Sequence, residues 1–276
     1  MTSVGPEKWV RPLEVLLLVL GCLLTSCAAT VEPPSAVQLE LAGSTSMQGL
    51  VEELAGAYTG RYDWVSIDID PRGTQLGLEA LRGGAVDVAL VSRELRPEET
   101  QGLEAVVIAY DAVAVIVNSQ NPVDDLTTAQ LRNIYSGQIL VWSELGGQEA
   151  DIQVVSREDG SGTREAFEGA MMQGEDVTTM AVVMPGSEAM GHFVEGNPLA
   201  VGYRSSVGIP LGTRALRIEG VGPGVQAVAQ GTYPLLRPFL LVIRQDAGQD
   251  ERSFVDFVLS PAGQVIVGQR YGRARH

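Results

Sequence analysis

Cysteine is scarce in this sequence: 276 residues contain only Cys22 and Cys27, both near the beginning of the chain. If the chain is cleaved just ahead of Cys27 and a lipid is attached to that cysteine, no free thiol remains that could form a disulfide, hold a metal or act as a nucleophile. Histidine is limited to His192 and the terminal His276, and no lysine follows Lys8, although a nucleotide-binding P-loop would need one after its glycines. These shortages argue against an enzyme, and we expect no catalytic residue, no metal site and no cofactor.

Positive charge is also in deficit, because 34 acidic residues face 19 basic ones and the net charge is −15. The first 26 residues contain two acids and two bases, so their removal leaves this charge unchanged. We therefore expect no nucleic acid partner. A small anion is not excluded, because helix ends and single arginines dominate the field within the screening length of about 8 to 10 Å.

No apolar run is long enough to span a bilayer, which needs roughly 20 residues. The apolar run Leu13–Leu24 is only about 12 residues long, which is shorter than a membrane span. It follows Lys8 and Arg11, as in a secretion signal. The sequence Leu24-Thr-Ser-Cys27 resembles a bacterial lipobox, in which the cysteine becomes the lipidated first residue. We expect residues 1–26 to be a lipoprotein signal peptide, Cys27 to carry the lipid and residues 27–36 to be a tether; the alternative is a cleaved signal with an incidental cysteine.

Turns rich in hydroxyl groups follow several strand-like segments. Three units share the plan of an apolar strand, a turn with a glycine or proline, and apolar residues at helical spacing. They are residues 37–58 with the turn 43–46, residues 65–81 with Thr74, and residues 152–171 with the turn 157–163. A fourth candidate is the apolar strand at 86–91, which ends at Ser92 and Arg93. A single such hydroxyl is usually an N-cap. Together, however, the turns predict a binding site, because parallel α/β sheets bind ligands along the edge where their strands end.

The segment from Val155 to Arg164 has the chemistry of an anion cradle. Gly160 and Gly162 let the backbone approach a ligand, Ser161 and Thr163 offer hydroxyls, and the following helix begins with unpaired N–H groups. Arg157 adds a charge-assisted contact to oxyanion oxygens.

A series of motifs in a fixed order resembles the phosphate-binding proteins of ABC transporters. The matching segments are Gly43-Ser-Thr-Ser-Met47, Val91-Ser-Arg-Glu-Leu95, residues 108–118, residues 131–147 with Trp142-Ser-Glu-Leu, Asp159-Gly-Ser-Gly-Thr-Arg164, Tyr233-Pro-Leu-Leu-Arg-Pro238 and residues 254–261. The resemblance implies an α/β, two-lobed periplasmic-binding-protein fold of type II, with the ligand cleft between the lobes and two hinge strands. It places lobe 1 at residues 37–110 plus 238–276 and lobe 2 at 111–237, with the apolar runs 106–117 and 239–243 as strands that pass between lobes.

The resemblance also implies a set of phosphate contacts. They are Thr45, Ser46, Thr74, Ser92, Arg157, Ser161, Gly162 and Thr163, with Ser44, Arg93 and Arg164 as further candidates. At Arg93 many members of the family have an aspartate that accepts the hydrogen of phosphate, so the replacement leaves selectivity between phosphate and sulfate open. Arg93 either binds the anion or pairs with Asp87 or Glu94. Arg164, in the first turn of a helix, needs a carboxylate or a ligand as partner.

The resemblance implies an extracytoplasmic protein, attached to the membrane only through a lipid, that captures inorganic phosphate as a monomer and delivers it to the transmembrane subunits of an ABC permease. Three alternatives remain: a protein for sulfate, molybdate or another oxyanion, a phosphate sensor without a transport role, and a phosphatase-like hydrolase. Few residues suit the last of these, because the Gly-Ser-Gly-Thr turn has no evident general base beside it.

Overall fold

The computed structural model describes residues 1–2 and 35–274, and the folded unit extends from Ala36 to the C-terminus. Cys27 and most of the predicted signal peptide and tether lie outside the described residues. Within the described part of the chain, none of the helices combines the length and the apolar character that crossing a membrane requires.

The fold is α/β, as the sequence predicts. Ten strands of the described chain form the main sheet, with the central order β2-β1-β3-β11-β4-β8-β6-β7 and with β9 and β12 paired to β4. The strands are β1 (Val37–Gly43), β2 (Val65–Asp70), β3 (Val88–Val91), β4 (Leu103–Asn118), β6 (Gln153–Arg157), β7 (Val182–Met184), β8 (Ala200–Ser205), β9 (Thr213–Ala215), β11 (Leu236–Arg244) and β12 (Gly272–Arg273), while β5 (Asp125–Leu126) pairs with β10 (Arg217–Ile218). The helices are α2 (Gln48–Thr59), α3 (Thr74–Arg82), α4 (Thr128–Tyr135), α5 (Gly162–Met171), α6 (Ser187–Gly196), α7 (Val225–Gln230), α8 (Gln249–Leu259) and α9 (Pro261–Val267), with 3-10 turns at Pro97–Glu99 and Trp142–Leu145.

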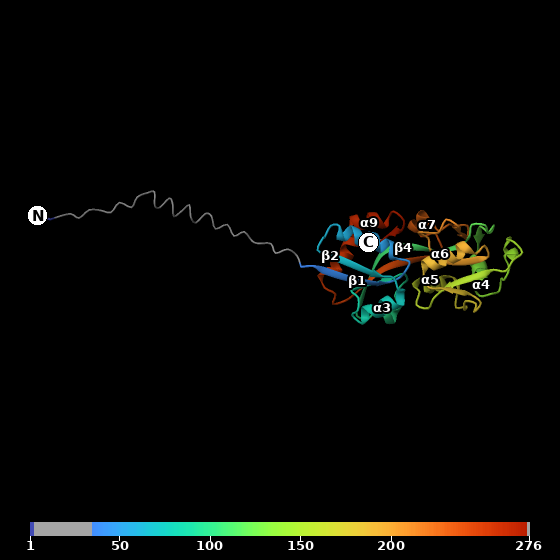
Figure 1. Cartoon of the computed structure of the whole chain (residues 1–276), viewed down its shortest axis with the longest axis horizontal. Coiled ribbons are helices and arrows are strands. Elements are labelled where there is room, and N and C mark those ends of the chain that lie inside the picture. The colour runs from blue at the N-terminus through green and yellow to red at the C-terminus, as the bar shows by residue number, and fades with distance from the viewer. Residues whose placement is uncertain (3–34, 275–276) are drawn as a thin grey trace. The chain divides into compact units, whose positions relative to one another are not determined.

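Lobe 1 contains β1, β2 and β3, which are parallel to one another. The alternation of apolar residues in the sequence becomes a buried face on β1 and on α2, which packs Leu50, Val51 and Leu54 into the core. Phe254 and Tyr271, from the C-terminal segment, belong to the same core, so this end of the chain returns to lobe 1. Figure 1 shows β1, β2, α3 and α9 grouped in one half of the folded unit.

Lobe 2 has its own core beneath β6, β7 and β8, where β6 is parallel to both neighbours. Trp142, Tyr135 and Phe167 are fully buried there, and the ring of Phe167 stacks on that of Tyr203 with 4.2 Å between centroids. In Figure 1, α4, α5 and α6 form this second half. Two separate cores agree with the two-lobed architecture.

The long strand β4 joins the two halves. Residues 103–112 pair with β11 and residues 113–117 pair with β8, so this strand passes from one lobe to the other, as predicted. The other predicted crossing lies elsewhere than expected. Residues 239–243 pair with β3 and β4 inside lobe 1, and the chain enters that sheet earlier, at the start of β11. The run is apolar because it is a central strand. The exact lobe boundaries stay a prediction.

Candidate anion-binding site

Three turns of lobe 1 place hydroxyl groups at one edge of the sheet, where β1, β2 and β3 end. The Ser44 hydroxyl donates to Ser92 Oγ at 2.8 Å, and Thr74 Oγ1 lies 3.4 Å from the same oxygen. Ser44 Oγ also accepts a bond from the Ser46 backbone N–H at 3.2 Å. All four side chains are buried. The parallel pairing of these strands, which the sequence predicts, therefore converts three separate turns into one hydroxyl cluster.

Lobe 2 presents its polar residues from β6 and from the starts of α5 and α6. Arg157 ends β6, and Gly162 and Thr163 begin α5. Ser161 is the N-cap of α5, and its hydroxyl oxygen accepts a bond from the Arg164 N–H at 3.3 Å. Ser187, which the sequence analysis did not include, is the first residue of α6.

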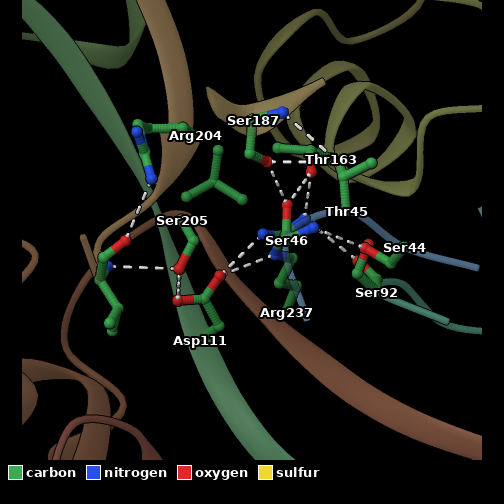
Figure 2. Close-up of polar contacts among 12 residues, drawn as sticks. Ser44, Thr45, Ser46, Ser92, Asp111, Thr163, Ser187, Arg204, Ser205 and Arg237 are labelled. Carbon is green, nitrogen blue, oxygen red and sulfur yellow. Dashed lines mark hydrogen bonds and ion pairs between the residues drawn. The ribbon is translucent and has the colours of Figure 1, made fainter. Parts of the chain in front are cut away.

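Hydroxyl groups of the two lobes meet directly. Ser46 Oγ lies 2.8 Å from Thr163 Oγ1 and 2.8 Å from Ser187 Oγ (Figure 2). Gly162 of α5 touches the lobe 1 turns, because a Cβ on it would lie 2.4 Å from Thr74 Oγ1 and 2.6 Å from Ser92 Oγ. The lobes are therefore closed on each other at the cluster, and residue 162 must lack a side chain.

Arg157 is buried against the cluster with 1% exposure. Its Nε and Nη2 each donate to a carboxylate oxygen of Glu158 at 2.7 Å. Nη2 also donates to Thr45 Oγ1 at 3.2 Å, and Nη1 donates to Ser187 Oγ at 3.3 Å. The arginine is fixed by its neighbouring carboxylate on one side and presents donors to hydroxyls of both lobes on the other.

A second buried arginine reaches the cluster, and the sequence analysis gave it no role. Arg237 of β11 donates from Nη1 to Thr163 Oγ1 at 2.7 Å. Its Nε and Nη2 donate to Asp111 of β4 at 3.0 and 2.8 Å, and Asp111 also accepts a bond from the Ser205 hydroxyl at 2.8 Å. Figure 2 shows this ion pair beside the hydroxyl cluster. Burial raises the pKa of Asp111 and lowers that of Arg237, although each partly offsets the shift of the other.

Arg93 is occupied by carboxylates rather than directed at the cluster. Its Nη1 and Nη2 donate to Glu99 at 2.7 and 2.9 Å, and its Nε lies 2.8 Å from Glu165 Oε2 of lobe 2. The expected kind of partner is therefore present, but the proposed acidic partners Asp87 and Glu94 were wrong. Asp87 instead accepts a bond from the Glu40 backbone, and only the backbone oxygen of Glu94 contacts Arg93.

Arg164 is likewise paired with acids. Its Nε donates to Glu168 at 2.7 Å and its Nη1 donates to Asp159 at 2.6 Å. A carboxylate or a ligand was expected as the partner of Arg164, and the structure contains carboxylate partners. Among the described residues, no group of histidine, cysteine, aspartate and glutamate has the arrangement of a metal site.

The structure thus brings together Ser44, Thr45, Ser46, Thr74, Ser92, Arg157, Gly162 and Thr163, and adds Ser187 and Arg237. Ser161 serves as a helix cap at the border of this group. A cavity of about 310 Å³ opens beside it, lined by residues of both lobes that include Thr45, Ser46 and Ser187. The carboxylates of Asp111 and Glu158 are bound to its arginines. Donors therefore dominate, which suits a tetrahedral oxyanion.

A signal for each missed residue was present in the sequence. Ser187 follows Val182–Met184 and Pro185-Gly186, which repeats the plan of strand, break, hydroxyl and helix in a short form. Arg237 and Asp111 are single charged residues within apolar runs, and two isolated opposite charges in buried strands indicate a pair.

Comparison with known proteins agrees with this geometry. Residues 28–262 match the family model of the PBP superfamily domain. A structure from Clostridium perfringens, described as a phosphate ABC transporter substrate-binding protein with bound phosphate, is 38% identical, with a TM-score of 0.84 over 86% of this chain and 100% of that one. An ABC-type phosphate transport receptor from Vibrio cholerae is 32% identical, with a TM-score of 0.72 over the same shares of the two chains. The phosphate-binding protein PstS of Bacillus subtilis is 29% identical over 89% of this chain and 84% of its own length.

Proposed function

This chain belongs to the family of phosphate-binding substrate-binding proteins of ABC transporters, and we propose that it captures inorganic phosphate at the hydroxyl cluster and delivers it to an ABC permease. One observation carries the proposal: hydroxyl groups of both lobes and the buried Arg157 converge on one small region. Both halves of the molecule must contribute for the site to exist.

The cluster explains how a bound anion would hold the lobes together. Ser46 Oγ lies within hydrogen-bond distance of both Thr163 Oγ1 and Ser187 Oγ, so one small anion could reach all three hydroxyls. Phosphate oxygens would accept from these hydroxyls, from the turn amides and from Arg157, and charge-assisted hydrogen bonds contribute about 1.5 to 3 kcal/mol each. The anion thus stabilises the closed form, which is the form that permease subunits would recognise.

The beginning of the chain supports a location outside the cytoplasmic membrane. We assign residues 1–26 as signal peptide and Cys27 as the lipidated residue, with residues 27–36 as the tether, so that the protein is attached by its lipid alone and acts as a monomer. Growth with a radiolabelled fatty acid should label the wild type and leave C27A unlabelled. Equal labelling of the two proteins would contradict Cys27 as the lipidated residue.

A broader anion specificity is the second candidate, favoured by the ion pairs of Arg93. The family's acidic acceptor is replaced at this position, and Asp111 and Glu158 are engaged by arginines. The remaining acceptors are hydroxyl oxygens, which accept the hydrogen of phosphate or donate to sulfate equally well. Neither Asp111 nor Glu158 is therefore free to repel sulfate.

Catalysis has little support in the site. His192 is the one histidine among residues 35–274, and its exposed side chain faces Glu188 and Glu195 on α6. The side-chain hydrogen bonds of the cluster are made by hydroxyls and arginines, and arginines bind the carboxylates of Asp111 and Glu158, so neither of these two suits a general base.

Calorimetric titration of the full chain in detergent, freed of bound anion, tests the proposal. Phosphate should bind in a one-to-one ratio, and no phosphate binding would contradict it. If sulfate binds with comparable affinity, the ligand of the site is tetrahedral oxyanions in general and not phosphate alone.

A further inference from the structure

We propose that Arg237 is a second arginine that contacts the bound anion, and that Asp111 is the residue that positions it. The proposal deepens the proposed function and rests on it. It assigns a ligand contact to a strand that the site motifs leave out.

The geometry of Arg237 separates its guanidinium group into two parts. Nε and Nη2 are directed at Asp111, whereas Nη1 extends past it to Thr163 Oγ1 at 2.7 Å. A purely structural ion pair would need only the first part. The Ser205 hydroxyl donates to Asp111 and holds this carboxylate in place, and the carboxylate in turn fixes the orientation of Arg237. The free edge of the guanidinium group therefore faces the hydroxyl cluster.

Stability alone does not account for the pair. Both side chains are almost completely buried, at 1% and 0% exposure. Burial raises the pKa of Asp111 and lowers that of Arg237, because both charges lose their hydration. Apolar residues of similar volume commonly stabilise such a position as well or better. A role in binding explains why charge is placed here.

A continuous path of hydrogen bonds links the two buried arginines. Arg237 Nη1 donates to Thr163 at 2.7 Å, Thr163 lies 2.8 Å from Ser46, and Ser46 lies 2.8 Å from Ser187 (Figure 2). At the other end of this path, Arg157 Nη1 donates to Ser187 at 3.3 Å. Two cations thus face the same three hydroxyls from opposite ends. An anion with two negative charges would be attracted to both arginines. The other donors of each arginine are bound to a carboxylate, Glu158 for Arg157 and Asp111 for Arg237.

The pair also lies where the lobes join. Asp111 and Arg237 are opposite each other in the pairing of β4 with β11. From this position Arg237 reaches the backbone oxygen of Ser92 in lobe 1 at 3.4 Å as well as Thr163 in lobe 2. The guanidinium group of Arg237 therefore contacts both lobes, and an anion bound to it would be linked to both.

The test is calorimetric titration of phosphate against full-chain variants at pH 6 and pH 8. In D111N/R237Q both charges of the pair are removed together, so that no unpaired charge is left buried. In R237K a charge remains beside Asp111, but the fork that reaches Thr163 is lost. R244Q removes an arginine at the far end of the same strand, where its contacts are Leu81 O and Val86 O, and serves as the matched control. Thermal unfolding without phosphate establishes that each variant is folded.

We expect phosphate affinity at pH 8 to fall about 10- to 100-fold in D111N/R237Q and in R237K, as for the loss of one charge-assisted bond, and to be unchanged in R244Q. We also expect the wild type to bind more tightly at pH 8 than at pH 6, because phosphate gains its second charge, and this gain should shrink in D111N/R237Q. D111N alone should reduce the same gain, which a merely structural defect would leave unchanged.

Three results would overturn the inference. Affinity within about threefold of wild type in either folded Arg237 variant would contradict contact with the anion, and an unaltered pH dependence in D111N would contradict positioning by Asp111. If phosphate binding is lost in R157Q but kept in the Arg237 variants, this inference alone fails. If the wild type does not bind phosphate at all, the proposed function fails together with it.

Discussion

Arg157 Nη2 donates a hydrogen bond to Thr45 Oγ1 at 3.2 Å, and this bond joins the end of β6 in lobe 2 to the first turn of lobe 1. The two residues are 112 positions apart in the sequence. Their contact depends on closure of the lobes, so ligand binding and closure involve the same atoms.

Loss of Arg157 should weaken phosphate binding more than loss of any single hydroxyl. Two charge-assisted bonds of about 1.5 to 3 kcal/mol each correspond to at least a 100-fold lower affinity for R157Q, at about 1.4 kcal/mol per tenfold. The change is measured by calorimetric titration. R132Q is the comparison, because Arg132 Nε donates to the backbone oxygen of Met171 at the C-terminal end of α5, and it should alter affinity less than about threefold. Equal effects of the two substitutions would contradict the assignment of Arg157.

Alanine at position 162 should prevent full closure. Its methyl group would overlap Thr74 Oγ1 and Ser92 Oγ. Overpacking of this kind costs about 1 to 3 kcal/mol, which corresponds to about 5- to 150-fold in affinity. G169A on the same helix is the matched control, because nothing lies within 4 Å of the added atom. Similar phosphate affinities of the two variants, measured by titration, would show that α5 does not approach lobe 1 so closely.

The ion pair between Arg93 and Glu165 should stabilise the closed form to a small extent. It joins the two lobes at 2.8 Å, but Glu165 is 29% exposed. Exposed pairs contribute about 0.2 to 1 kcal/mol, so E165Q should weaken phosphate binding by about 1.5- to 5-fold. E168Q removes a pair that lies within α5 and should leave affinity unchanged. Stronger binding by E165Q would indicate that Arg93, once released, turns to the anion.

Glu99 should make folding stability sensitive to acid. Burial alone would raise the pKa of Glu99, but hydrogen bonds from Arg93 and Arg96 outweigh burial and lower it from 4.5 to about 2. Because the pKa is lower in the folded state, the stabilisation is present above pH 4.5 and is lost as the pH falls towards 2. E99Q should therefore lose less stability than wild type over this window, and should be less stable at pH 7 by about 1.5 to 3 kcal/mol.

Urea unfolding at pH 7, 5 and 3 measures this difference. Glu98, whose side chain is 70% exposed and 3.9 Å from Arg96, provides the control E98Q. If the stability of E99Q and of wild type declines in parallel between pH 5 and pH 3, Glu99 is not held by its arginines in solution.

The hydroxyl turns could be predicted from sequence because their signals are local. Alternating apolar residues before Ser44 and helical spacing after it specify strand, turn and helix within about 20 residues, which is the range over which such patterns operate. Parallel strands then bring the turns of Thr74 and Ser92 to the same edge without further information.

The second arginine depends on long-range pairing and was missed for that reason. Arg237 and Asp111 are 126 residues apart, and only the register of β11 against β4 places them opposite each other. The acidic partners of Arg93 were also missed, in part because one of them is distant in the sequence. Glu99 is six residues away, but Glu165 belongs to the other lobe, and local sequence offered Asp87 and Glu94 as equally good acids.

A crystal structure of the full chain with bound phosphate tests the central claim most directly. The account predicts one phosphate among the cluster hydroxyls, within hydrogen-bond distance of Ser46, Thr163 and Arg157, with the bonds that now join Ser46 to Thr163 and Ser187 replaced by bonds to the anion. Phosphate bound elsewhere, with these three hydroxyls still bonded to one another, would contradict it.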